Sequence, residues 1–237
     1  MAADIVRLKS AREGAVASGG QSRLLLKDEA YTKIRELLLD ESSEASYSER
    51  ALAARLDLGL GPVRSAIERL RADGLIVVSP NSGFRMPEIT SREILDFYEL
   101  RMVIECHVAK SLAGCVSAGD ALQVEKILTE QEASAASGDT TRYHHLDLEF
   151  HSALAELHGN TEMEHALRRL RDKMYRLARR MHHAHPERLV VNAAQHRAIF
   201  DAVRGGNAEE AYQRMKTHLD WGRRFTLDPD RRLGVDW

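Results

Sequence analysis

Two pairs of polar residues set the strictest limit on how this chain can fold. Asp147 and His151 are four residues apart, so on a helix both side chains leave the same face, one turn from each other. His196 and His218 lie on either side of a turn signal, Gly205-Gly206-Asn207. With a helical rise of about 1.5 Å per residue, both would stand roughly 15 to 17 Å from the bend of an antiparallel hairpin, at matching height. All four side chains can therefore meet only if three helices pack side by side.

These four polar side chains lie on faces that are otherwise apolar. His196 shares its face with Ile199, and His218 shares its face with Met215. Unpaired carboxylates and imidazoles on buried faces cost free energy, whereas one divalent cation satisfies all four groups. Three imidazoles and one carboxylate favour zinc, with manganese, nickel or iron(II) as alternatives, over calcium. A single buried histidine is more often a hydrogen-bonded core residue. Three histidines and an aspartate at matched spacing favour a metal site.

Two further groups of histidines are rival candidates. His182, His183 and His185 cluster before a proline, and His144 and His145 are adjacent. Neighbouring side chains on a helix point in different directions, so neither group is well placed to share one ion. Both groups are therefore predicted to be solvated.

The composition predicts a mostly helical protein without an overall basic surface. The 237 residues include 34 basic and 36 acidic ones, so the net charge of -2 gives no general attraction to nucleic acid. Ala, Leu, Glu and Arg are abundant, which favours helices. Cys106 and Cys115 form no CxxC pattern and are predicted to be reduced, buried cysteines of a cytoplasmic protein. No apolar run reaches the roughly 18 to 20 residues of a membrane span, so no membrane partner is expected.

The N-terminal part has the pattern of three helices and a hairpin. Apolar residues recur at helical spacing between 24 and 39, and Ser48 is an N-cap type residue before a run rich in Ala and Leu. Two glycines interrupt the chain before Pro62, which is tolerated in the first turn of a helix. The expected elements are helices at 24–39, 49–56 and 62–72 and strands at 75–78 and 84–86. This order predicts a winged helix-turn-helix.

Beyond this part the pattern is helical to about residue 226, with breaks at glycines and at Pro186. Helices are expected near 91–116, 120–137, 140–158, 161–183, 187–204 and 208–226, and the first of them could be split, giving seven. The predicted fold is mainly α, a winged helix-turn-helix followed by an all-α antiparallel helical bundle. The predicted division is a flexible tail at 1–22, the winged domain at 23–87, a linker at 88–90, the helical domain at 91–228 and a C-terminal tail at 229–237.

Several motifs in both parts resemble one family of bacterial regulators. They are Ser48-Glu49-Arg50-Ala51-Leu52-Ala53, the run from Pro62 to Leu75, Asp147-Leu148-Glu149-Phe150-His151, Gln195-His196-Arg197-Ala198-Ile199 and His218-Leu219. The chain resembles the GntR family of transcription regulators, in its FadR-type branch with an FCD effector domain. The resemblance covers nearly the whole chain after the tail, and it implies a metabolite-responsive regulator that binds double-stranded operator DNA as a homodimer.

For the winged domain, the resemblance implies a recognition helix in the major groove and a wing along the neighbouring backbone. It assigns Arg50 and Arg64 to DNA contact and Gly83 to the wing tip, and it places Leu60 and Gly61 at contact positions before the proline. Arg can bind guanine or phosphate through two hydrogen bonds, and Gly allows a close backbone approach.

The chain departs from the family pattern just before this proline. The family has Ser/Thr, Arg/Lys and Thr where this chain has Gly59, Leu60 and Gly61, so an N-cap hydroxyl and a basic contact are missing. Residues 21–87 hold ten basic and ten acidic side chains, so the domain itself is neutral. We expect ordinary or weak operator affinity, with Leu60 placed to meet a thymine methyl group.

For the helical domain, the resemblance implies a small organic carboxylate, such as a sugar acid or hydroxy acid, at open positions of the metal. Arg101 and Glu105 occupy the Arg and Glu positions usual on its first helix, and both are expected to bind the effector, with Arg101 on a second polar group of the ligand. Asn192, one turn before His196, is a further candidate for the same pocket. The alternative for Arg101 and Glu105 is a surface ion pair.

Two other functions compete with regulation. A metal-dependent enzyme acting on a small carboxylic acid would use the same ligand set, because such sites can activate water. However, no general base stands at a suitable spacing, and a winged domain has no use in such an enzyme. A helical interaction module with a purely structural metal is the third possibility.

Overall fold

The computed structural model describes residues 26–39, 46–79, 83–183 and 185–231. The predicted tail at 1–22 and residues 232–237 of the predicted C-terminal tail lie outside them. The chain divides into two compact units, Met1–Glu88 and Ile89–Trp237, and each is described by itself.

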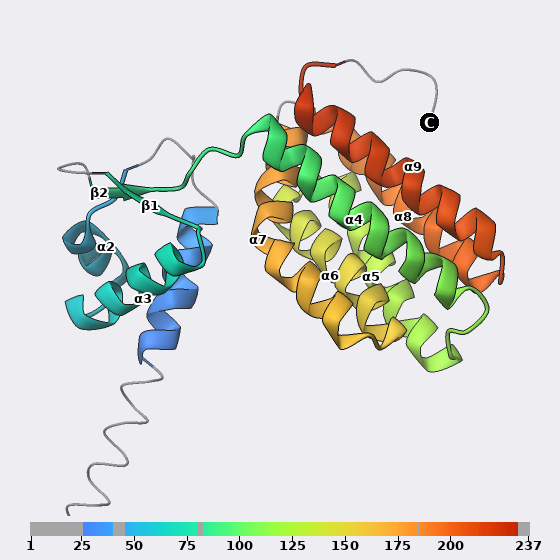
Figure 1. Ribbon diagram of the computed structural model, residues 1–237, viewed down its shortest axis with the longest axis horizontal. Helices are drawn as coiled ribbons and strands as arrows, with labels where there is room; N and C mark the ends of the chain where they lie inside the picture. The colour runs from blue at the N-terminus through green and yellow to red at the C-terminus, as the bar shows by residue number, and fades with distance from the viewer. Residues whose placement is uncertain (1–25, 40–45, 80–82, 184, 232–237) are drawn as a thin grey trace, which may run out of the picture. The chain divides into compact units, whose positions relative to one another are not determined.

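The described residues of the first unit form three helices and a hairpin (Figure 1). The first helix is described over residues 26–39. It is followed by α2 (Glu49–Leu56), α3 (Leu60–Ala72), β1 (Val77–Ser79) and β2 (Gly83–Arg85). Ser48 caps α2 by accepting a hydrogen bond from the amide of Ala51 at 3.2 Å. This capping satisfies one of the free amides at the helix start, as the N-cap residue type predicts.

The hairpin is held to the helices through Phe84. Strands β1 and β2 are antiparallel, with Val78 opposite Phe84. On the other side of Phe84, Tyr47 exchanges two backbone hydrogen bonds of 2.9 Å with it. Phe84 is only 3% exposed. It packs in a small core made by the helices and the hairpin, whose other large members are Ile34, Leu38, Leu52, Leu70 and Ile76.

Element boundaries in this unit differ from the sequence prediction by one or two residues, and both strands are shifted: β1 is Val77–Ser79 and β2 is Gly83–Arg85. Helix α3 begins at Leu60, two residues before the expected start at Pro62, and Gly59 is its N-cap. The strand begins at Val77 and not at residue 75, because Leu75 and Ile76 turn into the core, where they are 5% and 1% exposed.

The second unit is a bundle. Its described residues form six helices: α4 (Ser91–Leu112), α5 (Ala118–Ser137), α6 (Thr140–His158), α7 (Thr161–His183), α8 (Arg188–Arg204) and α9 (Ala208–Leu227). The first helix is therefore a single one, and it ends four residues before the expected position 116. The chain leaves it through Gly114, at a φ of 73° that favours glycine, and the amide of Gly114 donates to the carbonyl of Val203 at 2.9 Å. Cys115 follows this turn and is exposed, so the prediction that both cysteines are buried is wrong for Cys115 and right for Cys106.

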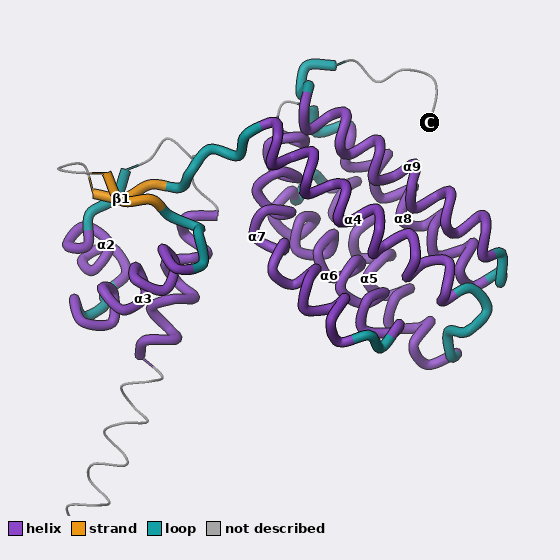
Figure 2. The backbone as a smooth tube through the Cα atoms, in the orientation of Figure 1, coloured by secondary structure: helices purple, strands orange, loops and turns teal. Residues whose placement is uncertain are grey.

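The helices of the bundle pack against one another along their lengths. Helix α4 lies along α9, α8 contacts both α9 and α5, and α6 contacts α5, α7 and α4 (Figures 1 and 2). Thr90 begins the bundle with a capping box, in which its side chain accepts from the amide of Glu93 and the Glu93 carboxylate accepts from the amide of Thr90. The mainly α prediction, a winged helix-turn-helix followed by a helical bundle, is confirmed. None of the helices in the described ranges has the length and apolar character needed to cross a membrane.

Candidate metal centre and its cavity

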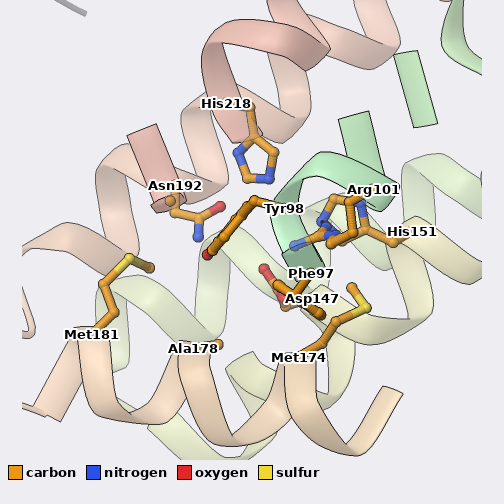
Figure 3. Close-up of a pocket in the computed structure, with 11 residues that line it drawn as sticks. Phe97, Tyr98, Arg101, Asp147, His151, Met174, Ala178, Met181, Asn192 and His218 are labelled. Atoms are coloured by element: carbon orange, nitrogen blue, oxygen red, sulfur yellow. Dashed lines mark hydrogen bonds between the residues drawn. The ribbon is translucent and has the colours of Figure 1, made fainter. Parts of the chain in front are cut away.

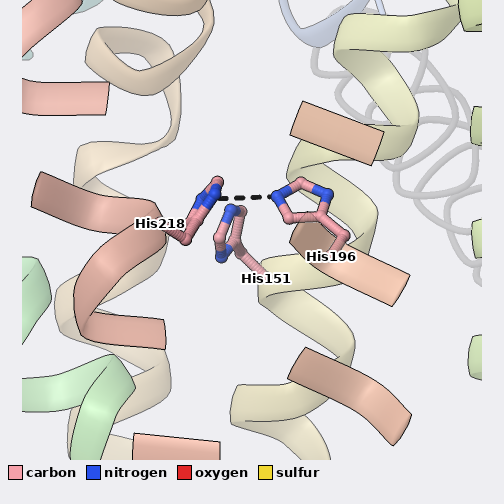
Figure 4. A group of neighbouring side chains, drawn as sticks. All are labelled: His151, His196 and His218. Carbon is pink, nitrogen blue, oxygen red and sulfur yellow. Dashed lines mark hydrogen bonds between the residues drawn. The ribbon is translucent and has the colours of Figure 1, made fainter. Parts of the chain in front are cut away.

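Three helices of the bundle bring three imidazoles to one point. His151 of α6, His196 of α8 and His218 of α9 each offer a ligand atom, and these atoms all lie within 4.8 Å of one another (Figure 4). The three side chains are 3%, 0% and 5% exposed. The expected convergence of helices from distant parts of the sequence therefore occurs at these residues.

Hydrogen bonds decide which nitrogen of each ring faces this point. The Nδ1 atom of His196 lies 2.9 Å from Oε1 of Gln131, and the Nδ1 atom of His218 lies 3.0 Å from Oε1 of Gln195. A carbonyl oxygen only accepts, so both Nδ1 atoms carry the proton and both Nε2 atoms carry a lone pair. These two Nε2 atoms face each other at 3.3 Å. Two lone pairs at this distance repel each other, and a cation between them removes the repulsion.

The distance between these two nitrogens also fits a metal site. Zinc binds histidine nitrogen at about 2.0 to 2.1 Å with tetrahedral geometry, which separates two nitrogen ligands by roughly 3.3 to 3.4 Å. The observed separation of 3.3 Å between His196 and His218 matches this value. The donor set therefore fits the metal that the sequence indicated.

His151 is oriented by an ion pair on α4. Its Nδ1 lies 2.5 Å from Oε2 of Glu105, and its Nε2 accepts a hydrogen bond of 3.1 Å from Nη2 of Arg101. Arg101 also donates to Glu105, from Nε at 2.5 Å and from Nη2 at 3.2 Å. Arg101 and Glu105 are only 6% and 2% exposed, so the alternative of a surface ion pair is wrong. Glu105 lies behind Arg101 and His151 and does not line the cavity described below.

Asp147 stands at the edge of the three-histidine group. It lies one turn before His151 on α6, and its Oδ1 is 3.7 Å from Nε2 of His196. It is not one of the residues that share the 4.8 Å span, but it lines the adjoining cavity. Burial raises the pKa of Asp147 above its ordinary value, and the neighbouring His151 and Arg101 oppose this shift only in part.

The protonation states of the other groups suit a cation. Burial lowers the pKa of His196 well below its ordinary value, and His218 and His151 lower it further. Burial lowers the pKa of His218 in the same way, together with His151 and Arg101. Burial alone would raise the pKa of Glu105, but Arg101 and His151 hold it below the usual range. Neutral imidazoles beside an ionised carboxylate are the forms that a metal requires of its ligands and their partners.

A cavity that opens to solvent lies beside the histidines (Figure 3). Its lining residues are Phe97, Tyr98, Arg101, Asp147, His151, Met174, Ala178, Met181, Asn192, His218 and Gly222. Two of the three residues expected to bind an effector, Arg101 and Asn192, are thus brought to the cavity. Asn192 is 3% exposed, and within the described part of the chain its Oδ1 has no hydrogen-bond partner.

A second histidine pair was missed by the sequence reasoning. His144 of α6 and His182 of α7 are 3% and 1% exposed, and Nε2 of His144 lies 3.1 Å from Nδ1 of His182. The prediction that both are solvated is wrong, whereas His145 and His183 are exposed as expected. The signal was present, because His144 lies two turns before His151 on the buried face of the same helix. Burial lowers the pKa of both, to about 4 for His144.

In the winged unit, the residues expected to contact DNA are on the surface. Arg50, Leu60, Gly61 and Arg64 are all exposed, and Leu60 is 42% exposed. Nε of Arg64 donates to Oε2 of Glu49 at 2.8 Å. At the start of α3, no side chain caps the helix, as the departure at Gly59 to Gly61 predicted. A free helix start with exposed Leu60 and Gly61 is compatible with close approach of DNA.

The backbone around Gly83 explains why glycine is required at this position. It is the first residue of β2 and not the tip of the hairpin, and its φ is 81°. A Cβ atom added here would lie 2.0 Å from the backbone oxygen of Tyr47. Only glycine allows this backbone contact, so packing inside the unit accounts for the residue without any DNA contact.

The two units match two known protein families. Residues 26–86 match the bacterial regulatory proteins of the gntR family, and residues 96–220 match the FCD domain. The chain belongs to the GntR family, in its FadR-type branch. This regulator is 22% identical over 193 residues to the uncharacterized HTH-type transcriptional regulator YdhC of Bacillus subtilis (strain 168), covering 80% of this chain and 86% of YdhC. It is 24% identical over 173 residues to the HTH-type transcriptional repressor RspR of Escherichia coli (strain K12), covering 73% and 75% of the two chains.

A solved structure has the same fold. The crystal structure of a putative GntR transcriptional regulator from Rhodococcus sp. RHA1 superimposes with a TM-score of 0.75 at 24% identity, over 87% of this chain and 99% of that one. The matches to the gntR family and the FCD domain identify the chain as a DNA-binding transcription regulator and not a metal-dependent enzyme. Regulators of this family bind operator DNA and generally act as dimers.

Proposed function

We propose that this regulator senses a small organic carboxylate through a divalent metal ion held by His151, His196, His218 and Asp147. The observation that carries the proposal is the pair of facing Nε2 atoms of His196 and His218, 3.3 Å apart, each with its proton held on the opposite nitrogen. Zinc is the favoured ion, with manganese, nickel and iron(II) as alternatives.

The surrounding residues have separate roles in this proposal. The bound ion supplies a Lewis-acid site whose open positions accept carboxylate oxygens. Arg101 lines the cavity and holds a second oxygen of the effector, while Asn192 offers its amide to a further polar group. Glu105 fixes the ring of His151 and makes it a stronger ligand. A cavity that adjoins the cluster supports a sensing role over a purely structural metal.

The winged unit is proposed to deliver the response to operator DNA as part of a homodimer. Arg50 and Arg64 bind DNA, Leu60 and Gly61 bring the start of α3 to the base edges, and Gly83 supports the wing. Effector binding shifts the balance between two arrangements of the dimer by the difference in its affinity for them. The exposed positions of the helix residues support this assignment.

Replacing His196 by alanine tests the metal role. The wild-type protein is expected to bind one zinc ion per chain in a competition titration against a chromophoric chelator, and His196→Ala is expected to lose this binding. His183→Ala is the matched control, because His183 is exposed on α7. Operator binding in a gel-shift assay reports that both variants are folded. Undiminished zinc binding by His196→Ala would refute the proposed centre.

A further inference from the structure

The walls of the cavity differ sharply in polarity, and this difference points to the chemical class of the effector (Figure 3). Building on the metal-bound carboxylate proposed above, we propose that the effector is a monocarboxylate with a short apolar body that carries at most one further polar group. Dicarboxylates, tricarboxylates and polyhydroxylated acids are excluded by the same walls. Charge, apolar surface and hydrogen-bonding capacity support the proposal separately.

The first argument is the net charge around the cavity, because the charged side chains beside it are buried. Arg101, Glu105 and Asp147 are 6%, 2% and 6% exposed. A divalent ion and the Arg101 guanidinium contribute three positive charges, and the carboxylates of Glu105 and Asp147 contribute two negative ones. One positive charge is left, which a single carboxylate neutralises. A second carboxylate would leave a net negative charge beside these buried groups, and such a charge is costly unless it is paired.

The wall formed by α7, with Phe97 of α4, provides no partner for a second charge. Met174, Ala178 and Met181 of α7 and Phe97 line the cavity there. Met174, Met181 and Phe97 are 5%, 3% and 3% exposed. Among the described lining residues, Arg101 is the only lysine or arginine, and its positive charge is already included in the sum above. An apolar group on the effector is the natural complement of this wall.

The hydroxyl of Tyr98 is engaged elsewhere. Thr226 donates its own hydroxyl proton to the carbonyl of Gly222 at 2.7 Å. Its oxygen can therefore only accept from Tyr98, at 3.0 Å, so the Tyr98 proton is used within the bundle. Gly222 leaves room for this arrangement, since a Cβ atom there would stand 2.9 Å from the Tyr98 hydroxyl oxygen. Tyr98 thus offers its ring to the cavity.

Asn192 is then the neutral polar side chain that can form a hydrogen bond with the effector. Its amide lies in the lining, and its Oδ1 has no partner among the described residues. One amide can satisfy one hydroxyl or oxo group beside the carboxylate. Several hydroxyl groups would leave the others unpaired against methionine and phenylalanine, which costs free energy for each.

Calorimetry on the zinc-loaded full-length protein tests this class with four-carbon acids. Butanoate and 2-hydroxybutanoate are expected to bind at least about tenfold more tightly than succinate, which differs by the second charge, and than 2,3,4-trihydroxybutanoate. Equal or tighter binding of succinate or of the trihydroxy acid overturns the inference but leaves metal-dependent carboxylate sensing intact. If none of the four acids binds while zinc is bound, the proposed function itself fails, and the inference fails with it.

A charge added to the apolar wall provides a second test. Ala178 lines the cavity and is half-buried, so Ala178→Lys places an ammonium group where its stem can reach solvent. This variant is expected to shift the ratio of succinate to butanoate affinity by at least about tenfold toward succinate. Ala178→Gln is the matched control of similar length without the charge, and its ratio should stay near that of the wild type. An unchanged ratio in zinc-loaded, folded Ala178→Lys contradicts the assignment of this wall.

Discussion

At the scale of single residues, the partner on the far nitrogen decides what each imidazole can do. Gln195 is adjacent to His196 in the sequence, yet it holds Nδ1 of His218 on the neighbouring helix. His196 is held by Gln131, which lies 65 residues away. The histidines could be predicted from their spacing, because each lies on one face of its own helix. Their partners could not, because these hydrogen bonds cross between helices and depend on how the helices are rotated.

Removing one of these partners should weaken the metal centre. In Gln195→Leu, Nδ1 of His218 loses its acceptor, so the ring is no longer held with Nε2 toward His196. We expect zinc affinity to fall by about 10- to 100-fold in a chelator competition. Gln213→Leu makes the same change at an exposed position of α9 and should bind zinc like the wild type. Equal affinity in the two variants would show that Gln195 does not orient the ring.

At the scale of helices and strands, the sequence predicted which elements exist better than where they end. The six bundle helices follow from apolar periodicity and from glycine or proline breaks, which are local properties. The end of α4 depends on a hydrogen bond from Gly114 to Val203 of α8, a contact that no local pattern contains. The start of α3 was placed too late because Pro62 was taken as its first residue, although Leu60 and Gly61 already have helical geometry.

Because α3 starts early, a substitution at Leu60 can test whether the first turn of this helix contacts DNA. Leu60 is 42% exposed in the first turn, where the family has a basic residue. Leu60→Arg should tighten operator binding in a gel-shift titration and increase the salt dependence by about one phosphate contact. Leu122→Arg adds the same charge at an exposed position of α5 in the other unit, so its operator affinity should not change. If Leu60→Arg binds no more tightly than Leu122→Arg, Leu60 faces away from the DNA.

At the scale of the whole molecule, the bundle encloses more titratable groups than the proposed metal centre needs. His144 and His182 form a buried pair on the interface of α6 and α7, beside the three converging histidines. The two-unit organisation and the family could be predicted because their motifs are contiguous. The buried pair was missed because each histidine was judged by its exposed neighbour, His145 or His183, and not by its own face of the helix. Burial of neutral imidazoles makes the stability of this unit depend on pH.

The expected loss of stability lies on the acidic side of neutrality. Burial lowers the pKa of His144 from 6.5 to about 4, so the unfolded chain takes up a proton there before the folded one does. The stability of the folded state is therefore complete above about pH 6.5 and falls as the pH drops toward 4, by on the order of 3 kcal/mol for this residue alone. His182, whose pKa is also lowered, acts in the same direction, whereas the raised pKa of Asp147 opposes it.

Urea unfolding of the metal-free protein between pH 7.5 and 5 measures this dependence. His144→Phe should reduce the slope by up to about 1.4 kcal/mol per pH unit, the value for one proton, while His183→Gln, at the exposed end of α7, should leave it unchanged. If His144→Phe retains the full slope, His144 is not held neutral in the folded protein.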